Sequence, residues 1–333
     1  MRAVQCSSHG PYREMHIVDL PAPAMIEGGV RIAVEAAGIG FANILQVAGT
    51  HQNSPPAPFI PGTEIAGRVL EVAGGVEHCG VGDRVAAAIG KGGYADEAVA
   101  DARNTFVMPD GLDYASATHM TTIYGTAYGA LVWKADIQPG EALLVHGAAG
   151  ASGLAAVEIG KARGARVIAT ASSAEKLAIA TNHGADHAIN YAEREFRDVV
   201  LDLTDGRGAD VIFDPVGGEV FDQSMRCIAP DGRLLPVGFA GGGLPTVKAN
   251  ILLVKNVSVH GLYWGYYTGW GRHPAPDRVR EKVRNAMNEL FGWFVEGRLK
   301  PVSETYPLSD FVRAMDLVAE RRVIGKAVLL PRA

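Results

Sequence analysis

The chain has few of the features that mark several common classes of protein. Its 333 residues include three cysteines, Cys6, Cys79 and Cys227, and none of them belongs to a CxxC pair. This number and spacing argue against a disulfide framework and against a cysteine zinc cage, so we expect three buried thiols. There is also no signal-peptide-like start and no apolar run of membrane-spanning length. A cytoplasmic protein with no membrane partner is therefore expected.

Positive charge is also scarce. The 31 lysines and arginines are outnumbered by 36 aspartates and glutamates, which gives a formal net charge of −5. Without a basic excess there is no evident electrostatic hold on a phosphate backbone, so nucleic acid is not expected as a partner. In contrast, 41 glycines and 48% hydrophobic residues are typical of a compact α/β enzyme with many tight turns. The length predicts about two domains.

The pattern of hydrophobic residues changes twice along the chain. Up to about residue 112, short β-branched runs are broken by glycine and proline, which predicts a β-rich domain. Strand and helix patterns then alternate down to about residue 265, as in a parallel sheet. Beyond that lie a long amphipathic helix near 278–296, a shorter helix near 310–321 and a last strand at 326–330. We expect this tail to fold back onto the N-terminal domain.

Residues 143–153, LLVHGAAGASG, are the one segment that indicates a ligand. They read as a strand and a small-residue turn, followed by a helix over 154–161 and a second strand over 165–171. In this setting Gly150 and Gly153 allow a tight turn and a close approach of the backbone to a pyrophosphate at the helix N-terminus. The segment therefore predicts a dinucleotide site.

The end of the second strand indicates which dinucleotide is bound. NAD sites usually keep an acidic residue there to bind the ribose diol, but this chain has Ala171. Ser172, Ser173 and Lys176 follow and offer hydroxyls, helix-start amides and a cation, which suit a 2′-phosphate. The sequence therefore favours NADPH. Ser172 and Glu175 also have the spacing of a capping box for the next helix.

Six further motifs stand in an order that resembles a known family. They are PGTEIAG at 61–67, VGDRV at 81–85, GGYADEA at 92–98, FDPVGG at 213–218, DGRL at 231–234 and GKAVL at 325–329. With the glycine turn, they make the chain resemble the zinc-independent medium-chain dehydrogenases/reductases of the quinone oxidoreductase, zeta-crystallin-like type. The resemblance implies an α/β protein with a GroES-like β-rich catalytic domain, residues 1–125, onto which 268–333 fold back. A doubly wound parallel-sheet Rossmann domain, residues 126–267, is implied beside it, with nicotinamide and substrate in the cleft between the two.

No metal is expected. Zinc-dependent relatives hold the metal with Cys, His and Cys, and the corresponding positions here are Gly40, Thr63 and Thr122, which do not make a plausible zinc site. Alcohol oxidation by the zinc mechanism is therefore disfavoured. The natural alternative is hydride transfer from NADPH to a quinone or another α,β-unsaturated carbonyl, which delocalises the developing charge.

The resemblance and the local chemistry together give a set of candidate site residues. The cofactor candidates are Thr126, Ala149, Gly150, Ala151, Ser152, Gly153, Ser172, Ser173, Lys176, Tyr191, Gly238, Phe239, Ala240, Leu262, Tyr263, Trp264 and Arg321, with Arg322 competing with Arg321. The pocket candidates are Asn43, His51, Tyr124, Thr126 and Tyr263. His51 and Tyr124 are alternative proton donors, although a reduced quinone can also take protons from water.

Three further expectations concern alternatives and partners. An enoyl-thioester reductase and a non-catalytic NADPH-binding protein both remain open. An assay of NADPH consumption with naphthoquinone, an enone and crotonyl-CoA distinguishes them. The resemblance also implies a homodimer, formed by pairing of the edge strand expected at residues 257–262 with its copy.

Overall fold

The computed structural model describes residues 1–270 and 275–333. Its contacts divide the chain into two compact units. Unit 1 contains residues 1–122, 265–295 and 302–333, and unit 2 contains residues 123–264 and 296–301. The chain therefore enters unit 2 within a helical segment and returns to it briefly between two elements of unit 1.

Unit 1 is built on a seven-stranded sheet in which the order is β14-β15-β3-β4-β5-β7, with β6 also paired to β3. The strands are β3 (Gly29–Ile39), β4 (Glu64–Val72), β5 (Arg84–Ala88), β6 (Glu97–Asp101), β7 (Thr105–Val107), β14 (Ser303–Pro307) and β15 (Lys326–Leu330). β3 organises the sheet because β4, β6 and β15 all pair with it antiparallel. The segment that includes β15 is thus part of the same sheet as the N-terminal strands.

Helices and a small second sheet complete unit 1. The bounds are β1 (Arg2–Gln5), β2 (His16–Asp19), α1 (Phe41–Val47), α2 (Tyr114–His119), α9 (Trp264–Tyr267), which begins at the last residue of unit 2, α10 (Asp277–Val295) and α11 (Phe311–Ala319). Residues from β3, β4, β5, α11 and β15 share one apolar core. The long amphipathic helix and the shorter helix expected near the C-terminal end are confirmed as α10 and α11.

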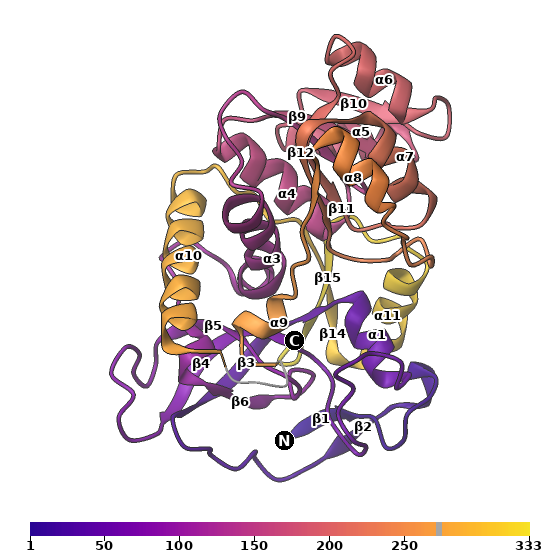
Figure 1. Ribbon diagram of the computed structural model, residues 1–333. Helices are drawn as coiled ribbons and strands as arrows, with labels where there is room; N and C mark the ends of the chain where they lie inside the picture. Colours follow the sequence, from indigo (N-terminus) through magenta and orange to yellow (C-terminus); the bar gives the residue numbers. More distant parts are fainter. Residues whose placement is uncertain (271–274) are drawn as a thin grey trace. The chain divides into compact units, whose positions relative to one another are not determined.

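Unit 2 is a six-stranded parallel sheet in the order β10-β9-β8-β11-β12-β13. Its strands are β8 (Ala142–Val145), β9 (Arg166–Ala171), β10 (His187–Asn190), β11 (Ala209–Asp214), β12 (Ile228–Pro236) and β13 (Ser258–Val259). The helices are α3 (Gly125–Tyr128), α4 (Ala151–Ala162), α5 (Ala174–Asn182), α6 (Phe196–Leu203), α7 (Glu219–Cys227) and α8 (Ala249–Lys255). Figure 1 shows the helices of this unit gathered around its strands.

The order of the strands fixes where a ligand can bind in unit 2. The chain begins at β8, adds β9 and β10 on one side, and then returns to add β11 on the other side of β8. In such open sheets, ligands bind beyond the carboxyl ends of the strands at the point where the order reverses. Here that point lies between β8 and β11, and the glycine turn follows β8 directly. The parallel sheet predicted from the alternating pattern is thus confirmed.

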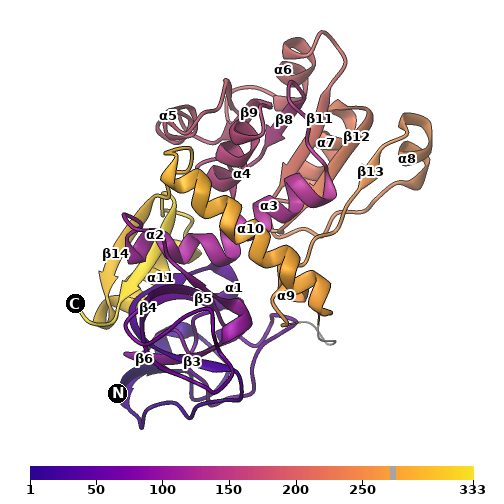
Figure 2. The same cartoon turned by 90° about the vertical axis from the view of Figure 1, so that its left-hand side faces the viewer.

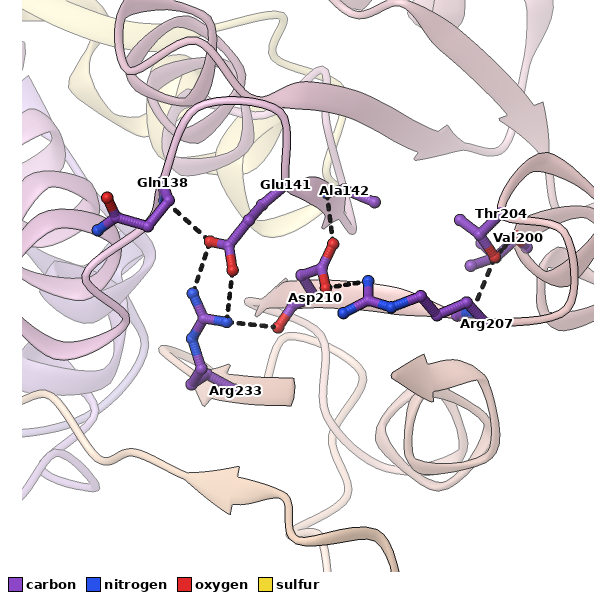
Figure 3. A network of polar contacts seen from close by, with 9 residues as sticks. Gln138, Glu141, Ala142, Val200, Thr204, Arg207, Asp210 and Arg233 are labelled. Carbon is purple, nitrogen blue, oxygen red and sulfur yellow. Dashed lines mark hydrogen bonds and ion pairs between the residues drawn. The ribbon is translucent and has the colours of Figure 1, made fainter. Parts of the chain in front are cut away.

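The amino ends of the same strands carry a polar network instead (Figure 3). Arg233 makes two bonds to Glu141, 2.8 Å from Nη1 to Oε1 and 2.6 Å from Nη2 to Oε2. Asp210 accepts a bond from the backbone N–H of Ala142 at 2.8 Å and pairs with Arg207. A two-bond guanidinium–carboxylate pair is geometrically specific as well as strong. The network ties β8, β11 and β12 together at the end opposite the glycine turn.

The structure can be compared with the expectations about the cysteines and about membrane-spanning segments. Cys6, Cys79 and Cys227 are free and buried, as expected for small apolar groups. Among residues 1–270 and 275–333, no helix is long and apolar enough to cross a membrane.

Candidate functional site

The glycine turn of unit 2 owes its shape to three glycines. Gly147 has a φ of +59°, a left-handed conformation that glycine adopts without strain. Gly150 is the N-cap of α4 and is exposed; its own N–H donates to Gly147 O at 3.0 Å, so the N–H groups that face outward at this end of α4 belong to the residues that follow it. Gly153 packs so closely that a Cβ there would lie 2.3 Å from the carbonyl oxygen of Gly147. The turn thus has the tight bend, the open approach and the close helix packing that a pyrophosphate site requires.

A second loop lies beside this turn at the carboxyl end of β11. Asp214 Oδ1 accepts bonds from the backbone N–H groups of Val216 and Gly217 at 2.8 and 2.9 Å, which fixes the loop. Pro215 comes close to the glycine turn, because a Cβ built on Gly147 would lie 3.6 Å from its Cγ. Asp214 is fully buried, and this burial raises the pKa of its carboxyl group.

The loop after β12 pairs with the loop after β11. Ala240 N donates to Pro215 O at 3.0 Å, and Gly241 N donates to Val216 O at 2.8 Å. Three cofactor candidates, Gly238, Phe239 and Ala240, therefore lie at the same sheet edge as the glycine turn. The side chain of Phe239 is 46% exposed there, so it is available to a ligand.

The predicted 2′-phosphate residues also gather at this edge. Ala171 is the buried last residue of β9, and Tyr191 N, just after β10, donates to its carbonyl at 3.2 Å. Ser173 is the N-cap of α5, with its side chain accepting from Lys176 N at 3.4 Å. The capping box expected to begin at Ser172 was wrong by one residue, because β9 keeps the backbone extended through Ala171 and the helix starts later. Lys176 forms no ion pair within the described part of the chain.

The segment around Thr126 is held against residues 262–264. A Cβ on Gly125 would lie 2.4 Å from the ring of Trp264, and one on Gly129 would lie 3.2 Å from Leu262 Cδ1. Trp264 is buried and stacks on Trp133, with the ring centroids 5.6 Å apart. The structure thus brings together the candidates Thr126, Leu262 and Trp264, with Tyr263 38% exposed between the last two.

Tyr124 forms a buried hydrogen bond that the sequence did not indicate. Its hydroxyl donates to Glu158 Oε2 at 2.6 Å, and the phenol is 1% exposed. Burial, and then the charge of Glu158, raise the pKa of Tyr124 well above its usual value. A phenol of this kind is a poor acid, so the structure does not favour Tyr124 as a proton donor. Glu158 was missed, although it is the only charged side chain among residues 154–160 of an apolar helix.

Three other candidates, Asn43, Arg321 and His51, belong to unit 1. Asn43 is 1% exposed, and its amide oxygen accepts from Gly40 N at 2.8 Å and from Tyr94 Oη at 3.2 Å. Its amide nitrogen donates to Thr63 and Gln46. Asn43 therefore shapes the start of α1 and is not an open substrate contact.

Arg321 is exposed at the end of α11, in a left-handed conformation with a φ of +58°.

His51 is the better of the two proton-donor candidates. It is half-buried, and burial lowers the pKa of its imidazole, so the ring is neutral near pH 7. Its Nδ1 accepts a bond from Asn53 N at 3.2 Å. A neutral imidazole carries one proton, so this contact places the proton on Nε2. His51 can therefore donate a hydrogen bond from Nε2 to an oxygen.

The three positions that correspond to zinc ligands do not fit a metal. Gly40 has no side chain, the Thr63 hydroxyl accepts a bond from Asn43 at 3.2 Å, and Thr122 offers only a buried hydroxyl. Within residues 1–270 and 275–333, no three His, Cys, Asp or Glu side chains are grouped so that they could hold a metal ion.

Unit 2 has a glycine turn at the carboxyl edge of its parallel sheet, and unit 1 is rich in β-strands. Together these features define a dinucleotide-dependent dehydrogenase or reductase with a GroES-like domain. Residues 26–110 match the family model described as "Alcohol dehydrogenase GroES-like domain", and residues 151–281 match "Zinc-binding dehydrogenase". A quinone oxidoreductase-like protein 2 homolog of Nematostella vectensis is 41% identical, and the alignment covers 96% of this chain and 88% of that protein.

Two further comparisons point to the same family. A quinone oxidoreductase of Pseudomonas aeruginosa is 34% identical over 91% of each chain. The structure of Escherichia coli quinone oxidoreductase complexed with NADPH has a TM-score of 0.88 and 30% identity, covering 99% of this chain and all of that one. The chain belongs to the medium-chain dehydrogenase/reductase family, in its quinone oxidoreductase type, and is an oxidoreductase. The resemblance and the fold class inferred from its motifs are confirmed.

Proposed function

We propose that the protein binds NADPH on unit 2 and reduces a quinone or a related α,β-unsaturated carbonyl without a metal. The observation that carries the proposal is the carboxyl edge of the parallel sheet, where the glycine turn, Ser173, Lys176 and Tyr191 lie together and β9 ends in Ala171. The similar Escherichia coli protein is a quinone oxidoreductase and was solved with NADPH, which supports the same cofactor and acceptor class here.

Each part of this edge has a distinct role in the proposal. The backbone N–H groups at the start of α4 bind the pyrophosphate, and the Ser152 hydroxyl can donate to it. Lys176 and the start of α5 bind the 2′-phosphate. Thr126 and residues 262–264 hold the nicotinamide, and Gly238, Phe239 and Ala240 line the same edge. When bound, NADPH supplies the hydride.

The developing negative charge on the acceptor needs a hydrogen-bond donor. We propose His51 for this role, since its Nε2 carries the proton in the neutral ring. A neutral imidazole polarises a carbonyl by donating a hydrogen bond, and the reduced quinone then takes its proton from water. Arg321 is proposed as a further contact to the 2′-phosphate, with Arg322 the alternative.

The preference for NADPH is the first test. We expect NADPH to bind at least about tenfold more tightly than NADH, a difference of about 1.4 kcal/mol. Replacing Lys176 with alanine should reduce this preference and leave NADH binding nearly unchanged, because only the 2′-phosphate contact is lost. Fluorescence titration of both cofactors measures it. Equal dissociation constants for the two cofactors in the unaltered protein would contradict the assignment.

The reaction itself is the second test. NADPH should be oxidised in the presence of naphthoquinone or a simple enone, with the same rate after treatment with a metal chelator. Replacing Thr126 with tryptophan should depress turnover far more than NADPH affinity, because most of the binding free energy comes from the phosphate groups. Turnover with crotonyl-CoA alone would instead support a thioester reductase. If NADPH binds but no acceptor is reduced, the protein is a non-catalytic NADPH-binding protein.

We also propose a homodimer formed through the edge of unit 2. Within the described residues, β13 pairs only with β12, so its other edge is open. The strand is shorter than the expected 257–262. Nearby, Leu253 and Val254 of α8 are 78% and 75% exposed. Figure 2 shows β13 and α8 together at the end of unit 2, beyond β12. An open edge beside apolar side chains favours pairing with a second copy.

Light scattering at micromolar concentration tests the dimer. We expect twice the mass of one chain, and we expect Ser258→Lys together with Leu253→Lys to give a single chain, because both positions are exposed and charges on both elements oppose association. The same two-lysine change at Leu70 and Val81, which are exposed in unit 1, is the control and should leave the mass unchanged. A single-chain mass for the unaltered protein would exclude the dimer.

A further inference from the structure

A buried carboxylate of unit 2 has no part in the binding or the chemistry proposed above. Glu158 is 2% exposed and lies in α4, where Ala155, Ala156, Val157 and Ile159 are buried with it. A carboxylate in such surroundings is costly unless hydrogen bonds satisfy it. Its contacts therefore indicate what it does for the fold.

The contacts of Glu158 come from three separate segments. Oε2 accepts from the Tyr124 hydroxyl at 2.6 Å, and Oε1 accepts from His183 Nδ1 at 2.5 Å. The backbone N–H of Lys300 donates to both oxygens, at 3.0 and 3.1 Å. Tyr124 lies 34 residues before Glu158 in the chain, and Lys300 lies 142 residues after it. One side chain of α4 thus fastens the first residues of unit 2 and the short segment by which the chain returns to it.

Tyr124 lies two residues before Thr126, and the residue between them is fixed from its other side. Gly125 packs under the Trp264 ring so closely that any Cβ would meet the ring at 2.4 Å. Trp264 is in turn held by its stack on Trp133. Together, Glu158 and Trp264 form a two-point clamp on the segment that leads into Thr126. We define this clamp by Tyr124, Gly125, Glu158 and Trp264.

The helix around the clamp is irregular. Residues Met120–Tyr124 and Gly129–Lys134 are π-helical, and α3 lies between them and packs on α4. A π-helical stretch has i→i+5 backbone hydrogen bonds in place of the i→i+4 bonds of an α-helix, and such stretches are rare and occur frequently at functional sites. Thr126 lies in the short α-helical piece between two of them, where Glu158 and Trp264 hold the residues next to it.

We propose that Glu158 is a positioning residue for hydride transfer: by holding Tyr124 it fixes Thr126 where the nicotinamide is to rest. This inference rests on the proposed function. A shift of the reacting groups by about 1 Å can lower a rate by about 100-fold, whereas the phosphate contacts that carry most of the affinity lie elsewhere on the sheet edge. Loss of the clamp should therefore lower kcat and leave NADPH affinity unchanged.

The test uses Tyr124→Phe, which removes one hydrogen bond, and Glu158→Gln, which keeps the shape of the side chain. We expect each to lower kcat with naphthoquinone by about 5- to 20-fold, while the Kd for NADPH stays within about 2-fold of the unaltered protein. The double variant should be no slower than the slower single variant, because both changes act on the one bond between Tyr124 and Glu158, whereas the bonds of Glu158 to His183 and Lys300 lie outside the clamp. Tyr306→Phe is the matched control, since Tyr306 donates to Glu304 at 2.8 Å in unit 1 and should keep the original kcat.

Each outcome decides the inference. A lower melting temperature with unchanged kcat in Tyr124→Phe shows a purely structural bond and overturns it. So does a weaker Kd for NADPH with unchanged kcat. If the unaltered protein turns over quinone and all variants match it, only this inference fails. If the unaltered protein binds no NADPH or reduces no acceptor, the proposed function fails first and this inference fails with it.

Discussion

Replacing Lys326 with methionine is expected to lower the free energy of unfolding by about 3–5 kcal/mol. Lys326 is 2% exposed in β15, its ammonium pairs with Glu64 of β4, and it also donates to the Thr118 carbonyl at 3.0 Å. The substitution leaves Glu64, 4% exposed, as a buried charge without its partner. Methionine has nearly the same length, so the loss reports on the charge rather than on a cavity.

Urea-induced unfolding measures the effect, and two controls define it. Lys161→Met removes a similar pair that is about one-third exposed, Lys161 with Asp186, and should cost no more than about 1 kcal/mol. The double change Glu64→Leu with Lys326→Met removes both charges and should recover most of the loss. If the Lys326→Met protein were as stable as the Lys161→Met protein, the ion pair between Lys326 and Glu64 would not stabilise the fold in the way we expect.

Replacing Gly153 with alanine is expected to weaken NADPH binding by at least about 100-fold, which is about 2.7 kcal/mol. The added Cβ would lie 2.3 Å from Gly147 O and 2.7 Å from Ala148 Cα. Both are backbone atoms, so the turn and the start of α4 must move apart, and the N–H groups that are to bind the pyrophosphate move with them.

Fluorescence titration with NADPH measures this change. Gly160→Ala is the matched control in the same helix, because the nearest atoms to its Cβ are side-chain atoms, Leu143 Cδ2 at 2.4 Å and Val167 Cγ2 at 3.2 Å, and not the backbone of the turn. We expect the control to keep the original affinity. If Gly153→Ala also kept it, the pyrophosphate would have to bind away from the turn.

Local patterns were enough to predict much of unit 2. The glycine turn and the residues after β9 lie within about 30 consecutive residues, and the alternation of strand and helix is made of units of similar length, so periodicity and turn chemistry act directly. The error at the start of α5 has the same local origin. Ser172 and Ser173 are equally good caps by type, and only the length of β9 decides between them.

Contacts between distant segments could not be predicted in this way. The bonds from Tyr124 and Lys300 to Glu158 depend on how α4 packs in three dimensions, and nothing in the neighbouring sequence specifies them. The same holds for Asn43, whose amide is used inside unit 1 by Tyr94 and Thr63. For His51, the sequence supplied a candidate, but only the bond from Asn53 N shows which nitrogen carries the proton.

The strand orders of the two sheets have a consequence for the synthesis of the chain on the ribosome. In unit 2, β8 is made first, and every later strand pairs with one that already exists. This sheet can therefore grow outward as the chain emerges. In unit 1, β3 must wait for β15, and Glu64 waits for Lys326, which is translated 262 residues later. A nascent chain thus carries residues 37–39 of β3 without a partner strand on the β15 side, and an unpaired acid, while unit 2 forms, and unpaired strand edges of this kind are prone to mispairing.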